Sequence, residues 1–168
     1  MQVIVAGFGN VLRGDDGFGV VVAQHLLDGP VPPGVRVLEI GIGGIHLVQE
    51  LLDGVDGLVV VDAVELGREP GEVMVLDPDR EDPATMDPDR RRDALADMHY
   101  ATPKRAFLLA TGLGVLPEAS LLVGCQAEDA ERLGEGLSPP VARSVATAAG
   151  EVRRIVTDLG IPWEAGSR

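Results

Sequence analysis

Short apolar segments alternate with longer segments of helical periodicity along this chain, and this alternation constrains the fold more than any other feature. Five segments rich in aliphatic and β-branched residues are expected to be strands, at residues 2–7, 35–40, 57–64, 71–77 and 118–126. Strands that alternate with helices build a mainly parallel sheet covered by helices on both faces. The sequence therefore predicts an α/β fold, a single three-layer α/β/α domain over residues 1–168 with a mainly parallel five-stranded sheet.

Apolar spacings and capping residues predict where the helices lie. Spacings of three and four from Phe18 to Leu26 indicate a first helix, and residues 41–54 indicate a glycine turn followed by a second. Two further helices are expected at 102–114, with Thr102 as N-cap, and at 138–160, with Ser138 as N-cap. The connection before the fourth strand is too short for a helix, so that strand is a candidate antiparallel edge strand.

Two segments lack such periodicity. Residues 77–99 are rich in Pro, Asp and Arg, and we expect a long surface loop near the functional site rather than a second domain. Residues 161–168 are expected to form a frayed tail.

The charge balance excludes one large class of partner. The chain carries 27 Asp and Glu against 14 Lys and Arg, a net charge of −13, which repels phosphate backbones and argues against nucleic-acid binding. A cation or a basic protein surface is the favoured partner. No apolar run approaches the roughly 18 residues of a membrane span, and no export signal precedes the first strand. With Cys125 as the single cysteine, we expect a soluble protein of the reducing cytoplasm.

The segment after the first strand, AGFGNVLRGDDGFG at residues 6–19, begins like a dinucleotide-binding loop. The third glycine of that motif is replaced by Leu12, and two carboxylates beside a helix N-terminus would repel a pyrophosphate, so nucleotide binding is disfavoured. Both carboxylates could serve only to cap the following helix and offset its dipole, although one suffices for that. We favour Asp15 as the cap and structural acid, and Asp16 as the carboxylate free to bind a cation.

Asp62 and His99 are the other candidate ligands. Asp62 ends the most apolar strand, where an unpaired buried charge needs a cation, a hydrogen-bond donor or water, although it could also cap the following loop. His99 ends the long loop, just before the helix expected at 102–114. In α/β folds the site lies at the carboxyl ends of the strands, where Asp16, Asp62 and His99 can converge. Two oxygens and one nitrogen suit a divalent metal such as nickel or zinc.

Other catalytic arrangements are weaker. His25 is expected to be packed or at the surface, and His46 has no evident partner in the sequence. Cys125 lies in an apolar strand, where an inert thiol is common, and no G-x-S-x-G motif is present. Asp16 and Asp62 could also form an acid–base pair, provided that the pKa of one of them is raised.

The residues described above resemble the hydrogenase maturation proteases. The similarity rests on GFGNVLRGDDGFG at residues 7–19, VVVDAV ending a strand at 59–64, His99, and GLSPPV at 136–141 before the last helix. The resemblance implies a cytoplasmic endopeptidase of α/β/α fold that removes a C-terminal extension from the nickel-loaded precursor of the [NiFe] hydrogenase large subunit. It also implies that Asp16, Asp62 and His99 recognise the nickel carried by that substrate.

The sequence departs from the family pattern at two places. Several members carry glutamate where this chain has Asp16, and the acid that starts the second loop, matched by Glu39, is followed here by Ile40. A metal held by the three predicted ligands could polarise the scissile carbonyl or activate water, which predicts a metal-dependent endopeptidase that could bind zinc in isolation. The alternatives are a non-catalytic metal-dependent binding or chaperone module on the same fold and, third, a nucleotide-binding protein.

Overall fold

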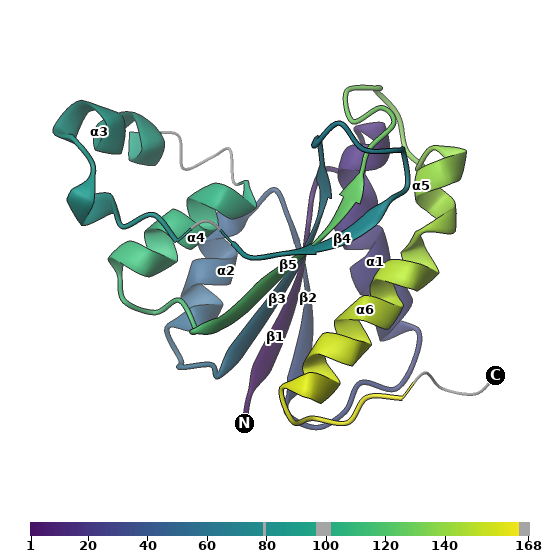
Figure 1. Ribbon diagram of the computed structural model, residues 1–168, viewed down its shortest axis with the longest axis horizontal. Coiled ribbons are helices and arrows are strands. Elements are labelled where there is room, and N and C mark those ends of the chain that lie inside the picture. The colour runs from purple at the N-terminus through teal and green to yellow at the C-terminus, as the bar shows by residue number, and fades with distance from the viewer. Residues whose placement is uncertain (79, 97–101, 165–168) are drawn as a thin grey trace.

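A five-stranded sheet with helices on both faces forms the centre of the protein (Figure 1). The computed structural model describes residues 1–78, 80–96 and 102–164. The strands lie in the order β2, β1, β3, β5, β4. Their bounds are β1 Val3–Phe8, β2 Val35–Gly41, β3 Gly57–Val64, β4 Val73–Leu76 and β5 Ala119–Gln126. All neighbours are parallel except β4, which pairs antiparallel with β5. The predicted α/β fold with its antiparallel edge strand is confirmed.

Each face of the sheet packs against its own group of helices (Figure 1). One face carries α1 (Phe18–Leu27) and α6 (Val145–Asp158), and the other carries α2 (Gly44–Leu51) and α4 (Pro103–Gly112). In β1, Val3 and Val5 join the core under α1 and α6, while Ile4 joins the core under α2 and α4. Because β1 and most of β3 are buried on both faces, their sequences are continuously apolar rather than alternating.

The last helical segment is divided at Ser144, where we predicted one continuous helix. α5 (Pro139–Arg143) ends there and α6 begins, and the Ser144 hydroxyl donates to the carbonyl of Gly71. The predicted caps Thr102 and Ser138 make no side-chain capping hydrogen bond within the part of the chain that the structure describes. The hydroxyl of Ser138 is bonded to Asp15 instead.

The segment expected to be a surface loop at 77–99 contains helical structure. A short 3-10 helix, η2 (Pro83–Thr85), is followed by α3 (Pro88–Ala96). Asp82 caps η2 by accepting a hydrogen bond from the N–H of Ala84 (2.8 Å). Periodicity does not reveal α3 because its sequence, PDRRRDALA, has no apolar stripe.

Residues 161–164, the described part of the segment expected to be a frayed tail, pack against the domain. Trp163 is buried, its indole N–H donates to the carbonyl of Pro30 (3.0 Å), and its backbone N–H donates to Thr157 Oγ1 (3.1 Å). The guanidinium of Arg153 lies over the indole, 5.9 Å from the ring centre. The described part of the tail is therefore anchored to the domain. No helix among the described residues has both the length and the apolar character to cross a bilayer.

Candidate functional site

The loop after β1 turns sharply at Gly9, whose φ of +114° favours glycine. A Cβ at this position would lie 1.6 Å from the carbonyl oxygen of Asp16, so only glycine fits. Asn10 Oδ1 accepts a hydrogen bond from the N–H of Leu12 (3.0 Å), the interaction that commonly stabilises such turns. The turn leads into a 3-10 helix, η1 (Gly14–Gly17), which carries Asp15 and Asp16.

Asp16 is half-buried at the carboxyl edge of the sheet. Its Oδ2 accepts a hydrogen bond from the backbone N–H of Asn10 (2.8 Å), which fixes the carboxylate to the β1 turn. Among the residues that the structure describes, no Lys or Arg forms an ion pair with Asp16 or Asp62. No Lys or Arg of the described part of the chain therefore compensates a negative charge on these two carboxyl groups.

Asp62 follows the buried run of β3 and is half-buried itself. Burial and the negative charge of Asp16 raise the pKa of the Asp62 carboxyl to about 8, although a hydrogen bond from the N–H of Ala63 acts in the opposite direction. The electrostatic coupling means that the two carboxyl groups lie near each other. Such a pair binds either a proton or a cation more readily than two isolated carboxylates.

Two glycines bring the helix that follows Asp16 against the strands. A Cβ at Gly19 would lie 2.1 Å from the carbonyl oxygen of Val61 and 2.5 Å from that of Phe8, while a Cβ at Gly7 would lie 2.2 Å from the carbonyl oxygen of Gly19. The N-terminus of α1 therefore touches the backbones of β1 and β3. This contact places η1 against the end of β3, beside Asp62.

Asp15 is fully buried and has a different role from its neighbour. Its carboxylate accepts hydrogen bonds from the backbone N–H groups of Glu128 and Asp129 (2.9 Å each) and from both the N–H (2.6 Å) and the hydroxyl (2.8 Å) of Ser138. Burial alone would raise the pKa of Asp15, but these hydrogen bonds hold it below its ordinary value. The assignment as a structural acid agrees with these bonds. The assignment as a helix cap is wrong, because Asp15 binds the loop between β5 and α5.

The third predicted ligand, His99, lies outside the described residues. No group of three or more His, Cys, Asp or Glu side chains in the described ranges could hold a metal ion. The described structure thus brings together Asp16 and Asp62, and the contribution of His99 remains a prediction. Two carboxylates that lack a basic partner suit a divalent metal only when further ligands complete its coordination.

The remaining sequence candidates lie apart from this pair. Glu39 is exposed on β2 and accepts a hydrogen bond from Gln24 Nε2 of α1 (2.8 Å). His46 is exposed on α2, with Nε2 at 3.3 Å from Glu50 Oε1. These contacts are those of surface side chains, although Glu39 still lies on the strand that leads to the carboxyl edge.

His25 and Cys125 agree with the structural roles expected for them. His25 is half-buried on α1, beside a groove that also includes Val21 and Leu137. Cys125 is fully buried in β5, and burial raises the pKa of its thiol to about 11. A thiol with that pKa is protonated near neutral pH, so it is a poor nucleophile.

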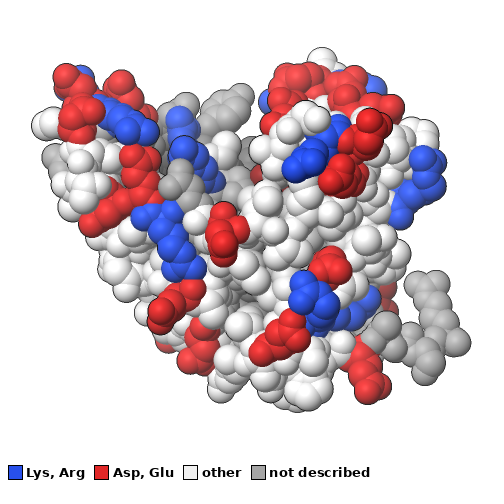
Figure 2. Space-filling model, viewed as in Figure 1, with Lys and Arg blue, Asp and Glu red and all other residues white. Residues whose placement is uncertain are grey.

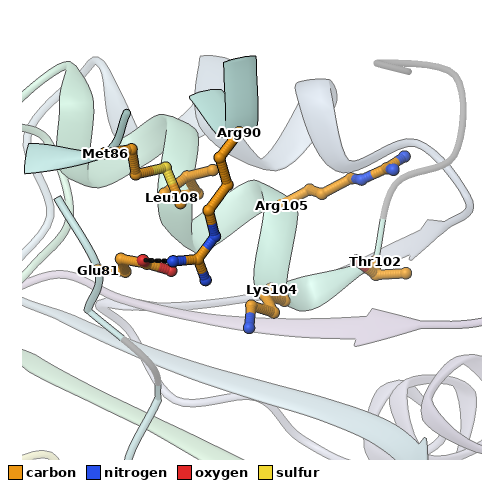
Figure 3. Close-up of a pocket in the computed structure, with 7 residues that line it drawn as sticks. All are labelled: Glu81, Met86, Arg90, Thr102, Lys104, Arg105 and Leu108. Carbon is orange, nitrogen blue, oxygen red and sulfur yellow. Dashed lines mark ion pairs between the residues drawn. The ribbon is translucent and has the colours of Figure 1, made fainter. Parts of the chain in front are cut away.

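Sequence reasoning missed a pocket between α3 and α4, with a volume of about 190 Å³ (Figure 3). Arg90 reaches from α3 toward Glu81, with its Nη1 3.2 Å from Glu81 Oε1, while Met86 and Leu108 supply apolar surface. Thr102 also lines the pocket, three residues after His99 in the sequence. In the sequence, the only indication of this pocket was a group of basic residues in an otherwise acidic chain, and the spacing of these residues matched no known motif.

Comparison with known proteins identifies the family. Residues 20–155 match the family model described as hydrogenase maturation protease. The chain is 31% identical over 161 residues to the hydrogenase expression/formation protein HupD of Bradyrhizobium diazoefficiens, covering 95% of this chain and 80% of that protein. It is 32% identical over 161 residues to the protein HoxM of Azotobacter vinelandii, covering 95% and 74%.

Solved structures agree with the sequence comparison. The hydrogenase maturating endopeptidase HybD from E. coli superposes with a TM-score of 0.74 at 26% identity, covering 96% of both chains. The [NiFe] hydrogenase maturation protease HycI from Thermococcus kodakarensis superposes with a TM-score of 0.70 at 26% identity, covering 93% of this chain and 92% of that one. The chain described here, with its paired carboxylates at the carboxyl edge of the sheet, belongs to the hydrogenase maturation protease family of endopeptidases.

Proposed function

We propose that this protein removes the C-terminal extension from the precursor of a [NiFe] hydrogenase large subunit, acting in the cytoplasm after nickel has been inserted. Family membership supports the protease activity over the alternative of a non-catalytic binding module. The paired carboxylates next to a helix N-terminus weigh against the nucleotide-binding alternative, since a pyrophosphate would be repelled there. The observation that carries the proposal is the proximity of Asp16 and Asp62 without a described basic partner.

In this proposal the nickel belongs to the substrate, and Asp16, Asp62 and His99 recognise it. Asp16 is held in place by the N–H of Asn10, so it can present a carboxylate oxygen without reorganising the β1 turn. Asp62 would release its proton when the cation arrives, because a nearby positive charge stabilises the ionised carboxylate. A precursor without metal offers no such compensation, so the two carboxylates select for the loaded form.

The bound metal could supply the chemistry that the described side chains lack. A divalent ion polarises a carbonyl or lowers the pKa of water. The described residues hold the substrate's metal close to the sheet edge and thereby place the adjoining tail of the precursor for cleavage. Zinc could occupy the same carboxylates in the isolated protein, because it accepts the same oxygen and nitrogen ligands.

The direct test is to incubate the protein with nickel-loaded precursor and to measure the mass of the large subunit. We expect loss of the C-terminal extension, and no loss from a nickel-free precursor. An unchanged mass of the loaded precursor would contradict the protease assignment.

Separate variants test whether Asp16, Asp62 and His99 bind the nickel of the substrate. Asp16→Asn, Asp62→Asn and His99→Ala should each abolish cleavage while the fold is retained, whereas His25→Gln should be nearly silent. Asp16→Glu keeps a carboxylate on a side chain one methylene longer and should retain more activity than Asp16→Asn. Full activity of His99→Ala would remove His99 from the site.

A further inference from the structure

Exposed apolar side chains gather at the carboxyl edge of the sheet, around the loop that carries Asp16. The described residues expose eleven large apolar side chains, and five of them lie on the loops after β1, β2 and β5 or on the first turn of α2. We name these five side chains the apolar rim: Val11, Leu12, Ile42, Ile45 and Leu133. Single exposed apolar residues are ordinary, but a group on adjacent loops marks an interaction surface.

Backbone hydrogen bonds hold the loops of the rim side by side. The N–H of Gly134 donates to the carbonyl of Leu12 (2.9 Å), and the N–H of Gly14 donates to the carbonyl of Gly134 (3.0 Å), which places Leu133 next to Leu12. The N–H of Gly9 donates to the carbonyl of Gly41 (3.0 Å), so the loop carrying Ile42 adjoins the same turn. The loops that carry Leu133 and Ile42 are therefore both hydrogen-bonded to the segment between β1 and α1 that carries Asp16.

Buried hydrogen bonds fix the position of the loop between β5 and α5, which carries Leu133. The carboxylate of Asp15 binds both ends of the loop between β5 and α5, at Glu128 and Asp129 on one side and at Ser138 on the other. Leu133, at the tip of that loop, is nevertheless 85% exposed. A loop that is anchored by a buried charge and yet presents a leucine to solvent is suited to contact another molecule.

The same loop is strongly acidic. Residues 128–136 contain four carboxylates, Glu128, Asp129, Glu131 and Glu135, against one arginine. Figure 2 shows one group of acidic side chains at the upper right of this view, where the loop between β5 and α5 lies. A partner that covers Leu133 would meet this negative charge, so its complementary surface should carry apolar side chains flanked by Lys or Arg.

We propose that the apolar rim is the docking surface for the large-subunit precursor, which contacts it through an apolar segment flanked by basic residues. This inference rests on the proposed function, because a protein substrate cut beside Asp16 must lie across the loops that surround Asp16. The rim supplies the binding energy for the body of the substrate. Asp16 and Asp62 then distinguish the nickel-loaded precursor from the metal-free one.

Matched variants separate the rim from exposed apolar residues elsewhere. Leu12 is 56% exposed and Leu113, which follows α4 at the opposite edge, is 55% exposed. Ile42 is 59% exposed and Leu52, which follows α2, is 60% exposed. Each rim variant, Leu12→Ser or Ile42→Ser, therefore has a control of equal exposure, Leu113→Ser or Leu52→Ser.

The experiment is steady-state cleavage of nickel-loaded precursor, together with a thermal melt of each variant. We expect Leu12→Ser, Ile42→Ser and Leu133→Ser to raise KM by about tenfold or more, since a large aliphatic side chain buried by the partner contributes at least that factor, and to leave kcat within about twofold. The controls should keep both constants, and all variants should melt at the same temperature. Glu135→Lys should also raise KM, whereas Asp53→Lys, in the turn after α2, should not.

Each other outcome has a definite meaning. If the unaltered protein cleaves the precursor but the rim variants keep its KM, or lose only kcat, the docking inference is wrong and the proposed function stands. If the unaltered protein does not cleave, the proposed function itself fails. If size-exclusion chromatography shows a dimer that Leu133→Ser dissociates without changing KM, the occupant of the rim is a second copy of this chain, and the proposal is overturned.

Discussion

Asp15 and Ser138 are joined by two hydrogen bonds, one from the backbone N–H of Ser138 to Asp15 Oδ1 (2.6 Å) and one from its hydroxyl to Asp15 Oδ2 (2.8 Å). Residues 123 positions apart are thereby connected through a fully buried carboxylate. The pair ties the loop that carries Leu133 to the loop that carries Asp16. The two loops at the candidate site are thus parts of one hydrogen-bonded unit.

Replacing this carboxylate should destabilise the protein. Asp15→Asn puts an amide where four donors converge, so we expect the free energy of unfolding to fall by about 3 kcal/mol at neutral pH. Because hydrogen bonds lower the pKa of Asp15 below its ordinary 3.8, this contribution is present above about pH 4 and is lost as the pH falls through the lower folded-state value. Urea denaturation of the unaltered protein and of Asp15→Asn, at pH 7 and at pH 3, measures both the loss of stability and its dependence on pH. An unchanged stability at pH 7 would contradict the role assigned to Asp15.

The contribution of Asp62 to stability should depend on pH in the opposite direction from that of Asp15. The pKa of Asp62 is raised from 3.8 to about 8, so the folded state holds the proton more tightly than the unfolded state. That contribution is complete below about pH 4 and is lost as the pH rises toward 8, by up to about 1.4 kcal/mol per pH unit. Asp62→Asn cannot ionise. It should therefore become progressively more stable than the unaltered protein between pH 5 and pH 8, while cleavage is lost.

Denaturation curves of the unaltered protein and of Asp62→Asn, measured across this pH range, isolate the contribution of the Asp62 carboxyl, because the two proteins share all other titrating groups. Asp16→Asn should reduce the pH dependence as well, since the negative charge of Asp16 contributes to the raised pKa of Asp62. Identical pH slopes in all three proteins would show that the two carboxyl groups are not coupled.

Gly19 sets the distance between α1 and the strands, and Gly19→Ala should be severely destabilising. The new Cβ would lie 2.1 Å from the carbonyl oxygen of Val61, so α1 must shift and carry Asp16 away from Asp62. We expect a loss of about 3 kcal/mol or more in the free energy of unfolding, together with loss of cleavage. Gly150→Ala is the control, because a Cβ there has no neighbour within 4 Å on the exposed face of α6. It should stabilise the protein by roughly 0.5–1 kcal/mol.

The tail should contribute to stability through Trp163. Trp163→Ala removes a buried indole and should lower the free energy of unfolding by about 3–5 kcal/mol. Trp163→Phe keeps most of the packing but removes the hydrogen bond to Pro30, so a loss of about 1 kcal/mol is expected from that bond. Chemical denaturation distinguishes the three proteins. A tail that frays in solution would give equal stability for all of them.

The sequence by itself determined the sheet class and the positions of its strands. The runs that became β1 and β3 are apolar on both faces, a pattern typical of buried parallel strands, and the short connection before β4 predicted its antiparallel edge position. Local periodicity did not reveal α3, whose residues form no apolar stripe, or the anchored tail, which depends on the contact of Trp163 with Pro30. The anchored tail depends on a contact between residues 133 positions apart, which local periodicity cannot reveal.

Only the tertiary structure revealed the partners that distinguish the two adjacent carboxyl groups of Asp15 and Asp16. Successive residues of a 3-10 helix point about 120° apart, so η1 directs Asp15 and Asp16 to different surroundings. Asp15 accepts hydrogen bonds from backbone N–H donors of a loop more than a hundred residues away, whereas Asp16 accepts one from the N–H of Asn10 and its negative charge acts on Asp62. Two identical side chains thus acquire different surroundings, because partners brought in by the fold determine the free energy of each charge.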